Sequence, residues 1–155
     1  MKNYIITALL TVFSVLSVSA QVKTDAQVSN LYKNYIEIKT SLSSDDADKA
    51  SASASEFIKS ASSAKALPES QLNKLKKDAD IIAKTKNIKN QREAFQRLSA
   101  NMIVLAKEYK LSAQPVFVQH CPMKNADWLS NEKQVVNPYY GKAMLSCGNV
   151  KSEIK

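Results

Sequence analysis

Apolar residues recur at steps of three and four from about residue 25 to residue 109, with charged and small polar residues between them. This spacing places the apolar side chains on one face of an α-helix and predicts four helices. The expected helices cover Asp25–Leu42, a segment after Ser43–Asp46, a segment from Pro68, and a segment from Asn87 or Asn90 to about Tyr109. Short connections predict antiparallel neighbours, and hence a mainly α fold built as an up-and-down four-helix bundle.

Each predicted helix has a set of residues expected to face the core, and two have recognisable starts. A hydroxyl or carboxylate of Ser43–Asp46 can accept the free amide protons that open the second helix. Pro68 suits a first helical position, where its missing N–H is not needed. The expected core residues are Val28, Leu31, Tyr32, Tyr35, Ile38 and Leu42; Ala47, Ala50, Ala54, Phe57, Ile58 and Ala61; Leu72, Leu75, Ala79 and Ile82; and Phe95, Leu98, Met102, Leu105 and Ala106.

The C-terminal residues 113–155 differ in composition from the helical part. They hold both glycines, both cysteines, the only histidine, the only tryptophan and three of the four prolines. This pattern predicts an irregular C-terminal segment with a short extended stretch at Val116–Val118 and a short helix further on. About forty such residues rarely fold alone, so we expect one helical-bundle domain over residues 21–155 with this tail packed on it.

The first twenty residues have the pattern of a cleavable signal peptide. Lys2 precedes the apolar stretch Ile5–Leu16, and Val18–Ala20 supplies small residues at a cleavage position. The apolar stretch is shorter than the ~20 residues that cross a bilayer, which favours cleavage over an uncleaved membrane anchor. We therefore expect a periplasmic or secreted protein with no transmembrane segment after cleavage.

The chain is basic, with a formal net charge of +8 at pH 7. A net positive charge is typical of proteins that bind nucleic acid, but the lysines here are spread along predicted helices without interleaved aromatic residues. Together with export, this distribution predicts a solvated basic surface, no nucleic-acid partner and a monomer.

Two short strips in the tail carry sulfur. In His120–Met123, the proline keeps Cys121 extended, so Cys121 and Met123 are expected to project to one side and His120 to the other. The second strip runs from Asn137 to Gly148. Asn137 is a good N-cap for a helix, and Gly148 is a good residue just past a helix end. A short helix between them would place Tyr140, Met144 and Cys147 on one stripe.

Two interpretations of the sulfur atoms remain open. Two thiolates and two thioethers are soft donors, which suit Cu(I) far better than Mg²⁺ or Ca²⁺. An exported protein with two cysteines also commonly joins them, and a Cys121–Cys147 disulfide would staple the tail. In that case Met123 and Met144 would be ordinary core residues.

Catalysis is poorly supported by the sequence. The only histidine is adjacent to a cysteine, and an extended backbone turns the two side chains apart. Carboxylates are scattered, and a chain with two glycines has no Gly-rich phosphate loop. We therefore expect no enzyme and no catalytic residues.

Several of these segments resemble one known family. The chain is similar to the bacterial family called domain of unknown function 3347, whose members are small exported proteins or domains fused to periplasmic adaptors of copper/silver efflux pumps. The matching segments are Tyr35–Lys39, Gln91–Phe95, Val118–Met123, Trp128–Ser130 and Asn137–Gly141, followed by Met144, Cys147 and Gly148. The short, glycine-free Lys124–Asp127 and Tyr140 in place of a phenylalanine depart from the pattern. The resemblance implies a link to heavy-metal handling, and it does not assign ligands.

The leading hypothesis is therefore an extracytoplasmic copper-binding protein that sequesters or carries Cu(I) through its tail. Cys121 and Cys147 would be primary ligands, Met123 and Met144 supporting ligands, and His120 an auxiliary ligand. Metal-efflux or other envelope proteins would be its partners. The alternative is a helical binding or scaffold module, stapled by a disulfide, that holds no metal. Trp128 and Leu129 are expected to anchor the tail to the bundle in both cases.

Overall fold

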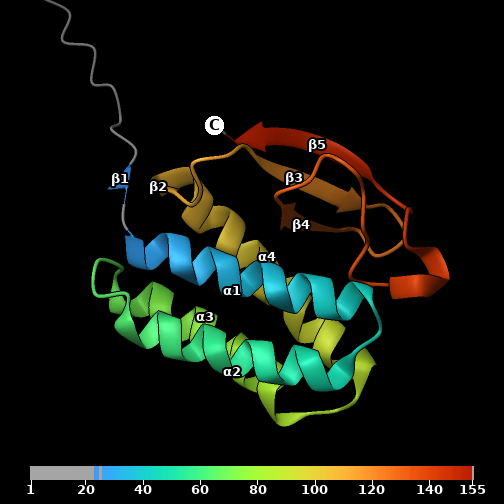
Figure 1. Ribbon diagram of the computed structural model, residues 1–155, viewed down its shortest axis with the longest axis horizontal. Coiled ribbons are helices and arrows are strands. Elements are labelled where there is room, and N and C mark those ends of the chain that lie inside the picture. The colour runs from blue at the N-terminus through green and yellow to red at the C-terminus, as the bar shows by residue number, and fades with distance from the viewer. Residues whose placement is uncertain (1–22, 25, 155) are drawn as a thin grey trace, which may run out of the picture.

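The computed structural model describes residues 23–24 and 26–154 of the chain (Figure 1). The expected signal peptide, residues 1–20, lies outside the described residues. The elements in chain order are β1 (Lys23–Thr24), α1 (Ala26–Ser43), α2 (Ala47–Ser63), α3 (Glu69–Lys84), α4 (Ile88–Glu108), β2 (Tyr109–Lys110), β3 (Val116–Cys121), β4 (Ala126–Ser130), the 3₁₀-helix η1 (Gly141–Met144) and β5 (Asn149–Ile154).

The mainly α fold with four consecutive helices is confirmed. α1 packs on α2, α2 on α3 and α3 on α4, and α1 also contacts α4, so the four helices enclose one core. The cap of α2 follows the prediction, and α4 begins after Asn87, one of its two expected starts. The carboxylate of Asp46 accepts the Lys49 N–H at 2.9 Å at the start of α2. The side chain of Asn87 accepts the Asn90 N–H at 3.1 Å at the start of α4. Pro68 is the residue just before α3, one position earlier than expected.

The helical periodicity identified the core correctly. All the residues expected to face the core are buried, except Ala47, Ile58 and Leu72, which are partly buried. Near the middle of α1, the ring of Tyr35 stacks on Phe95 of α4, with centroids 5.2 Å apart. Burial of these side chains, rather than helix propensity, supplies most of the stability of such a bundle.

The tail is more ordered than expected. β3, β4 and β5 form an antiparallel sheet in the order β4-β3-β5, so the predicted extended stretch is its central strand. Figure 1 shows the sheet on the side of α1 that faces away from α2. The short β1 pairs in parallel with β2 after α4. The sequence predicted the extended stretch, but it did not predict β4 or β5.

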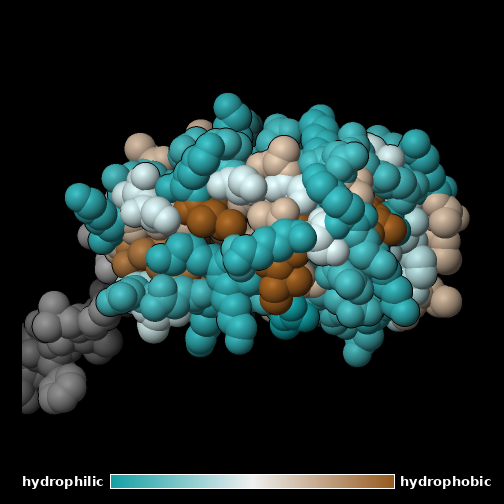
Figure 2. Space-filling view, turned by 90° about the horizontal axis from the view of Figure 1, so that it is seen from below, coloured by the Kyte–Doolittle hydropathy of each residue, from teal (hydrophilic) through white to brown (hydrophobic). Residues whose placement is uncertain are grey.

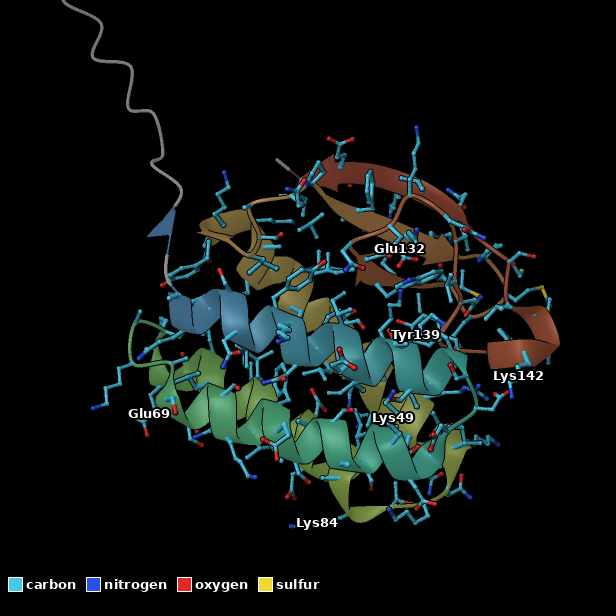
Figure 3. All side chains as sticks on the ribbon, viewed as in Figure 1. Lys49, Glu69, Lys84, Glu132, Tyr139 and Lys142 are labelled. Atoms are coloured by element: carbon cyan, nitrogen blue, oxygen red, sulfur yellow. The ribbon has the colours of Figure 1, made fainter. Side chains whose placement is uncertain are left out.

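The predicted anchors do tie the tail to the bundle. Trp128 and Leu129 are completely buried. The Leu129 N–H donates to the Tyr35 hydroxyl at 3.0 Å. Tyr139 lies between the strands and the helices (Figure 3), with its ring 6.0 Å from Phe95 and edge-on to Trp128 at 5.7 Å. The sheet and the bundle therefore share aromatic packing.

The outer surface is mostly hydrophilic. Figure 2 shows one face, seen from below the view of Figure 1, on which hydrophobic residues are scattered in small groups. Among the described residues, the large hydrophobic side chains that remain exposed are Ile81, Val104, Met123 and Leu145. In the same part of the chain, every helix is too short or too polar to cross a membrane.

Candidate functional site

The first sulfur-bearing strip lies at the end of β3 and in the turn that follows. Cys121 pairs with Ala126 of β4 and is completely buried. His120 pairs with Asp127 and is partly exposed, so neighbouring residues on β3 point to opposite faces, as predicted.

Met123 does not share a face with Cys121, and that prediction is wrong. The strand ends at Cys121, and the Asn125 N–H donates to the Pro122 carbonyl at 3.3 Å to close a turn. Asn125 has a φ of 48°, a left-handed conformation that asparagine tolerates. The thioether of Met123 therefore projects from the turn, 65% exposed.

The second strip does not form the expected short α-helix from Pro138 to Cys147. Only Gly141–Met144 is helical, as a 3₁₀ turn, because Gly141 has a φ of 57° and interrupts a right-handed helix. Asn137 does cap this segment, since its side-chain oxygen accepts the Tyr139 N–H at 2.8 Å. Its side-chain N–H also donates to the Cys147 carbonyl at 2.7 Å. Met144 and Cys147 are both partly buried.

The two strips come together at one end of the sheet. β5 begins at Asn149, which pairs with His120 of β3. The preceding Gly148 approaches β3 so closely that a Cβ on it would lie 2.6 Å from the His120 carbonyl oxygen. Only glycine fits there, because the position also has a φ of 145°. Cys147 therefore directly precedes Gly148, the residue that touches the strand carrying His120 and Cys121.

The thiols themselves are not paired. Both cysteines are free and are not near each other, so the Cys121–Cys147 disulfide considered from the sequence is not formed. Within residues 23–24 and 26–154, no group of three or more histidine, cysteine, aspartate or glutamate side chains is arranged to hold a metal ion.

A charged cluster surrounds His120, and the sequence did not reveal it. The Nδ1 atom of His120 lies 2.6 Å from Oδ1 of Asp127. The other oxygen, Oδ2, accepts a hydrogen bond from the Lys151 ammonium at 2.8 Å. Partial burial raises the pKa of Asp127, but the hydrogen bonds from Lys151 and His120 outweigh it and hold that pKa below its ordinary value. Asp127 is thus a carboxylate at neutral pH.

A second cluster holds η1 against the bundle. The Arg92 guanidinium pairs with Asp45 at 2.5 Å and donates to the Pro138 carbonyl at 2.9 Å. The backbone N–H of Lys142, labelled in Figure 3, donates to the other carboxylate oxygen of Asp45 at 3.1 Å. A side chain at Gly141 would collide with both members of the ion pair. Together these bonds hold the first half of the second sulfur-bearing strip against the bundle.

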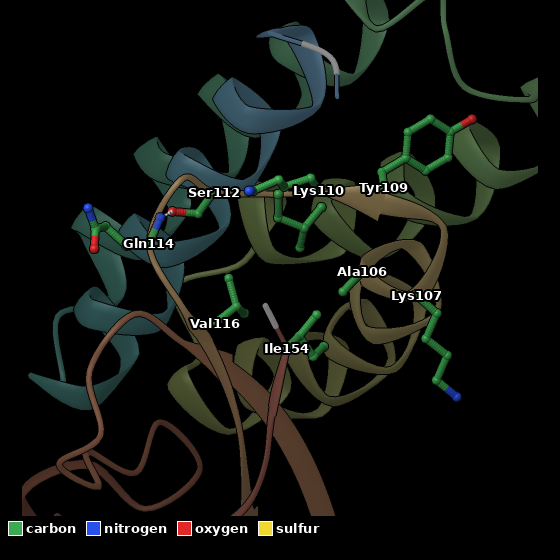
Figure 4. A pocket seen from close by; sticks show the side chains of 9 residues that line it. Ala106, Lys107, Tyr109, Lys110, Ser112, Gln114, Val116 and Ile154 are labelled. Atoms are coloured by element: carbon green, nitrogen blue, oxygen red, sulfur yellow. Dashed lines mark hydrogen bonds between the residues drawn. The ribbon is translucent and has the colours of Figure 1, made fainter. Parts of the chain in front are cut away.

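Two pockets lie away from these residues. Figure 4 shows one of about 250 Å³ beside the end of α4, lined by Val116 and Ile154 among others. These two residues pair at the opposite end of the sheet from His120. Another pocket, of about 660 Å³, lies between α1 and the loop before β3. None of the five candidate metal-binding residues lines either pocket.

A family model described as "Protein of unknown function (DUF3347)" matches residues 31–114, which is more than half of the chain. The chain belongs to the DUF3347 family. The matched segment runs from α1 to the loop before β3, so it covers most of the helical bundle of this DUF3347 protein. It ends before His120, and family membership therefore gives no assignment for the sulfur-bearing tail. No curated protein and no solved structure matched the chain.

Proposed function

We propose that this DUF3347 protein binds Cu(I) outside the cytoplasm and sequesters or carries it. The proposed primary ligands are the thiolates of Cys121 and Cys147, with the thioethers of Met123 and Met144 as supporting ligands and the imidazole of His120 as an auxiliary one. The observation that carries the proposal is the close approach of Gly148 to the His120 carbonyl, because it draws both sulfur-bearing strips to one end of the sheet.

The chemistry of the donors supports copper over harder ions. Thiolate and thioether sulfur bind Cu(I) strongly, whereas Mg²⁺ and Ca²⁺ take oxygen ligands. Zinc is less well matched, because structural zinc sites use four cysteine or histidine ligands and this chain has two cysteines and one histidine. Both cysteines are free, which is the form that coordination requires.

Differences in exposure suggest an order of binding. Met123 is exposed, and Met144 and Cys147 are partly exposed, so an incoming ion can reach these three from solvent. Cys121 is completely buried and is closed off from solvent. In this proposal the surface donors capture the ion first, and Cys121 completes the site afterwards.

A titration of the reduced protein with Cu(I), in competition with a chromogenic Cu(I) chelator, tests the proposal. We expect one ion per chain. The double substitution Cys121→Ser and Cys147→Ser should lower the affinity by roughly a hundredfold or more, because losing a ligand costs more than losing its outer-shell support. Unchanged affinity in that double variant would refute copper binding through the tail.

Methionine substitutions supply a matched control. Met123→Leu and Met144→Leu each remove a proposed donor, and both should lower the affinity. Met102→Leu changes the same type of residue inside α4, where Met102 is completely buried, and it should leave the affinity unchanged. Equal affinities in all three variants would exclude the thioethers as ligands.

The alternative function, a metal-free helical binding module, predicts a different outcome. The reduced protein would then take up no copper. Two titratable thiols per chain together with copper uptake would support the proposed function. Copper delivery to or from metal-efflux or other envelope proteins is part of the same proposal.

A further inference from the structure

We propose that the pocket between α1 and the loop before β3 binds a small zwitterion, a free amino acid or a short peptide with an apolar side group. In this proposal the Lys33 ammonium binds the carboxylate of the ligand and the Glu37 carboxylate binds its ammonium. The site is independent of the proposed copper binding, because none of the five candidate metal ligands lines this pocket.

Three separate parts of the chain form the pocket. α1 supplies one wall, the loop that begins at Leu111 supplies the second, and Asn131, which follows β4, adds a side-chain amide. The volume of about 660 Å³ lies within the roughly 300–1,000 Å³ that is usual for small-molecule sites. A ligand of a few residues or less therefore fits.

The loop wall of the pocket is fixed by the fold. Leu111 is 3% exposed, so its burial anchors the start of the loop. The Gln114 N–H donates to the Ser112 hydroxyl at 3.0 Å, which closes a tight turn in the same loop (Figure 4). These three residues also line the pocket drawn in Figure 4, so the loop stands between two cavities. Both walls are thus in place before a ligand arrives.

Two opposite charges on α1 have no partner in the protein. Lys33 and Glu37 are exposed, line the pocket and lie one helical turn apart. Opposite charges at this spacing commonly pair on a helix surface. Here neither side chain makes an ion pair or a hydrogen bond with another residue in the described part of the chain. The pocket therefore offers one free ammonium and one free carboxylate.

This combination of charges selects the class of ligand. A simple anion that approaches Lys33 is repelled by Glu37, and a simple cation that approaches Glu37 is repelled by Lys33. A molecule that carries both an ammonium and a carboxylate satisfies both side chains, since Lys33 only donates hydrogen bonds and the Glu37 carboxylate only accepts them.

The pocket also has an apolar part. Ile36 is partly buried and shares the helix face of Lys33 and Glu37, being three positions after the first. Leu111 adds a second aliphatic side chain from the loop. An aliphatic side group on the ligand would remove apolar surface from water at this place. We therefore expect leucine-like side groups to bind better than polar ones.

Tyr32 contributes a buried hydroxyl that the fold does not use. Tyr32 lines the pocket, is 5% exposed, and its hydroxyl makes no hydrogen bond in the described structure. Burial raises the pKa of Tyr32 well above its ordinary value, so the hydroxyl keeps its proton at neutral pH. A buried hydroxyl without a partner is unfavourable. A charged group of the ligand would supply the missing partner.

Nuclear magnetic resonance of the isotope-labelled full chain tests the proposal with defined probes, L-leucine and L-leucyl-L-leucine. Each should cause saturable shifts of the backbone amides of Lys33, Leu111 and Asn131, and none at Trp128. N-acetylleucine lacks the ammonium and leucinamide lacks the carboxylate, so each should bind roughly tenfold more weakly than leucine. Tighter binding of the dipeptide identifies a short peptide as the ligand, and tighter binding of leucine identifies a free amino acid.

Charge substitutions assign each end of the ligand to one residue. Lys33→Gln should weaken leucine binding roughly tenfold and abolish the difference between leucine and leucinamide. Glu37→Gln should instead abolish the difference between leucine and N-acetylleucine. Lys49→Gln is the control, because Lys49 is an exposed lysine on α2 outside the pocket, and it should change neither the affinity nor the two differences.

Tyr32→Phe tests the site without disturbing the fold. It removes only an unbonded hydroxyl, so the urea unfolding midpoint should hardly change, while the affinity for leucine should fall roughly 3- to 10-fold. The proposal is overturned if neither probe causes saturable shifts around the pocket. It is equally overturned if leucine, leucinamide and N-acetylleucine bind alike, or if Tyr32→Phe binds leucine as tightly as the unsubstituted protein.

Discussion

Replacing Gly141 by alanine should destabilise the protein through one identifiable contact. Gly141 opens η1 with a φ of 57°, where an alanine is strained. A Cβ there would overlap the Asp45 carboxylate and the end of the Arg92 side chain. The substitution therefore combines backbone strain with the displacement of an ion pair whose Asp45 carboxylate also accepts the Lys142 N–H of η1.

The size of the effect follows from these two parts. A left-handed conformation costs a non-glycine residue roughly 1–2 kcal/mol. The ion pair between Arg92 and Asp45 is partly exposed and contributes at most about 1 kcal/mol. Displacing Asp45 also removes a hydrogen bond from the Lys142 amide to a charged acceptor. We expect a total loss of about 3 kcal/mol, or roughly 10 °C in the unfolding midpoint.

Urea unfolding followed by tryptophan fluorescence measures this loss, because Trp128 is the only tryptophan and is completely buried. In an Asp45→Ala background, Gly141→Ala should cost about 1 kcal/mol less, since the crowding with the carboxylate is gone. Lys142→Ala is the control, because it keeps the backbone N–H and should change stability by less than about 0.5 kcal/mol. The same cost for Gly141→Ala in both backgrounds would refute the crowding argument.

Two further predictions concern buried tyrosines. Tyr35→Phe removes the hydroxyl that contacts Ser99 at 2.8 Å and accepts the Leu129 N–H, so it should cost about 2 kcal/mol. Tyr32→Phe is its control and should hardly change the free energy of unfolding, because the Tyr32 hydroxyl is buried without a hydrogen bond in the described structure. Equal losses of stability for the two variants in urea unfolding would contradict this reasoning. Burial raises the pKa of both tyrosines well above the ordinary 10.0. The folded state therefore keeps protons that the unfolded state releases, and stability should fall as pH rises past about 10. Tyrosinate absorbance that appears before unfolding in the same pH range, and that is lost in Tyr32→Phe or Tyr35→Phe, would show that these hydroxyls are not protected.

The tail shows where local sequence patterns stop being sufficient. The strand over residues 116–121 was predicted in part, because β-branched and aromatic residues favour extended backbone. β5 offered only a weak signal, Val150 and Ile154 after a glycine, and Pro122 with Asn125 is typical of a turn that the sequence analysis did not predict. Nothing local paired these segments, since strand register depends on contacts between residues far apart in the chain.

The candidate site was predictable only as a set of residue types. The sequence named His120 and both sulfur-bearing strips, but it missed Asp127, which lies seven positions away and meets His120 only through the β3–β4 register. The expected side-by-side arrangement of Cys121 and Met123 failed because the strand ends between them. The expected stripe through Met144 failed because Gly141 takes a left-handed conformation that a right-handed helix does not contain.

The sequence by itself determined the four helices, their core faces and the capping of α2, because helix formation depends on neighbours three and four residues apart and on the side chains at each end. Only the tertiary structure decided which parts of the tail lie together. Strand order, the separation of the two thiols and the contact between His120 and Asp127 all depend on where distant segments pack. The physical reason is the burial of Trp128 and Tyr139, whose rings pack on each other and, through Tyr139, on Phe95 of the bundle.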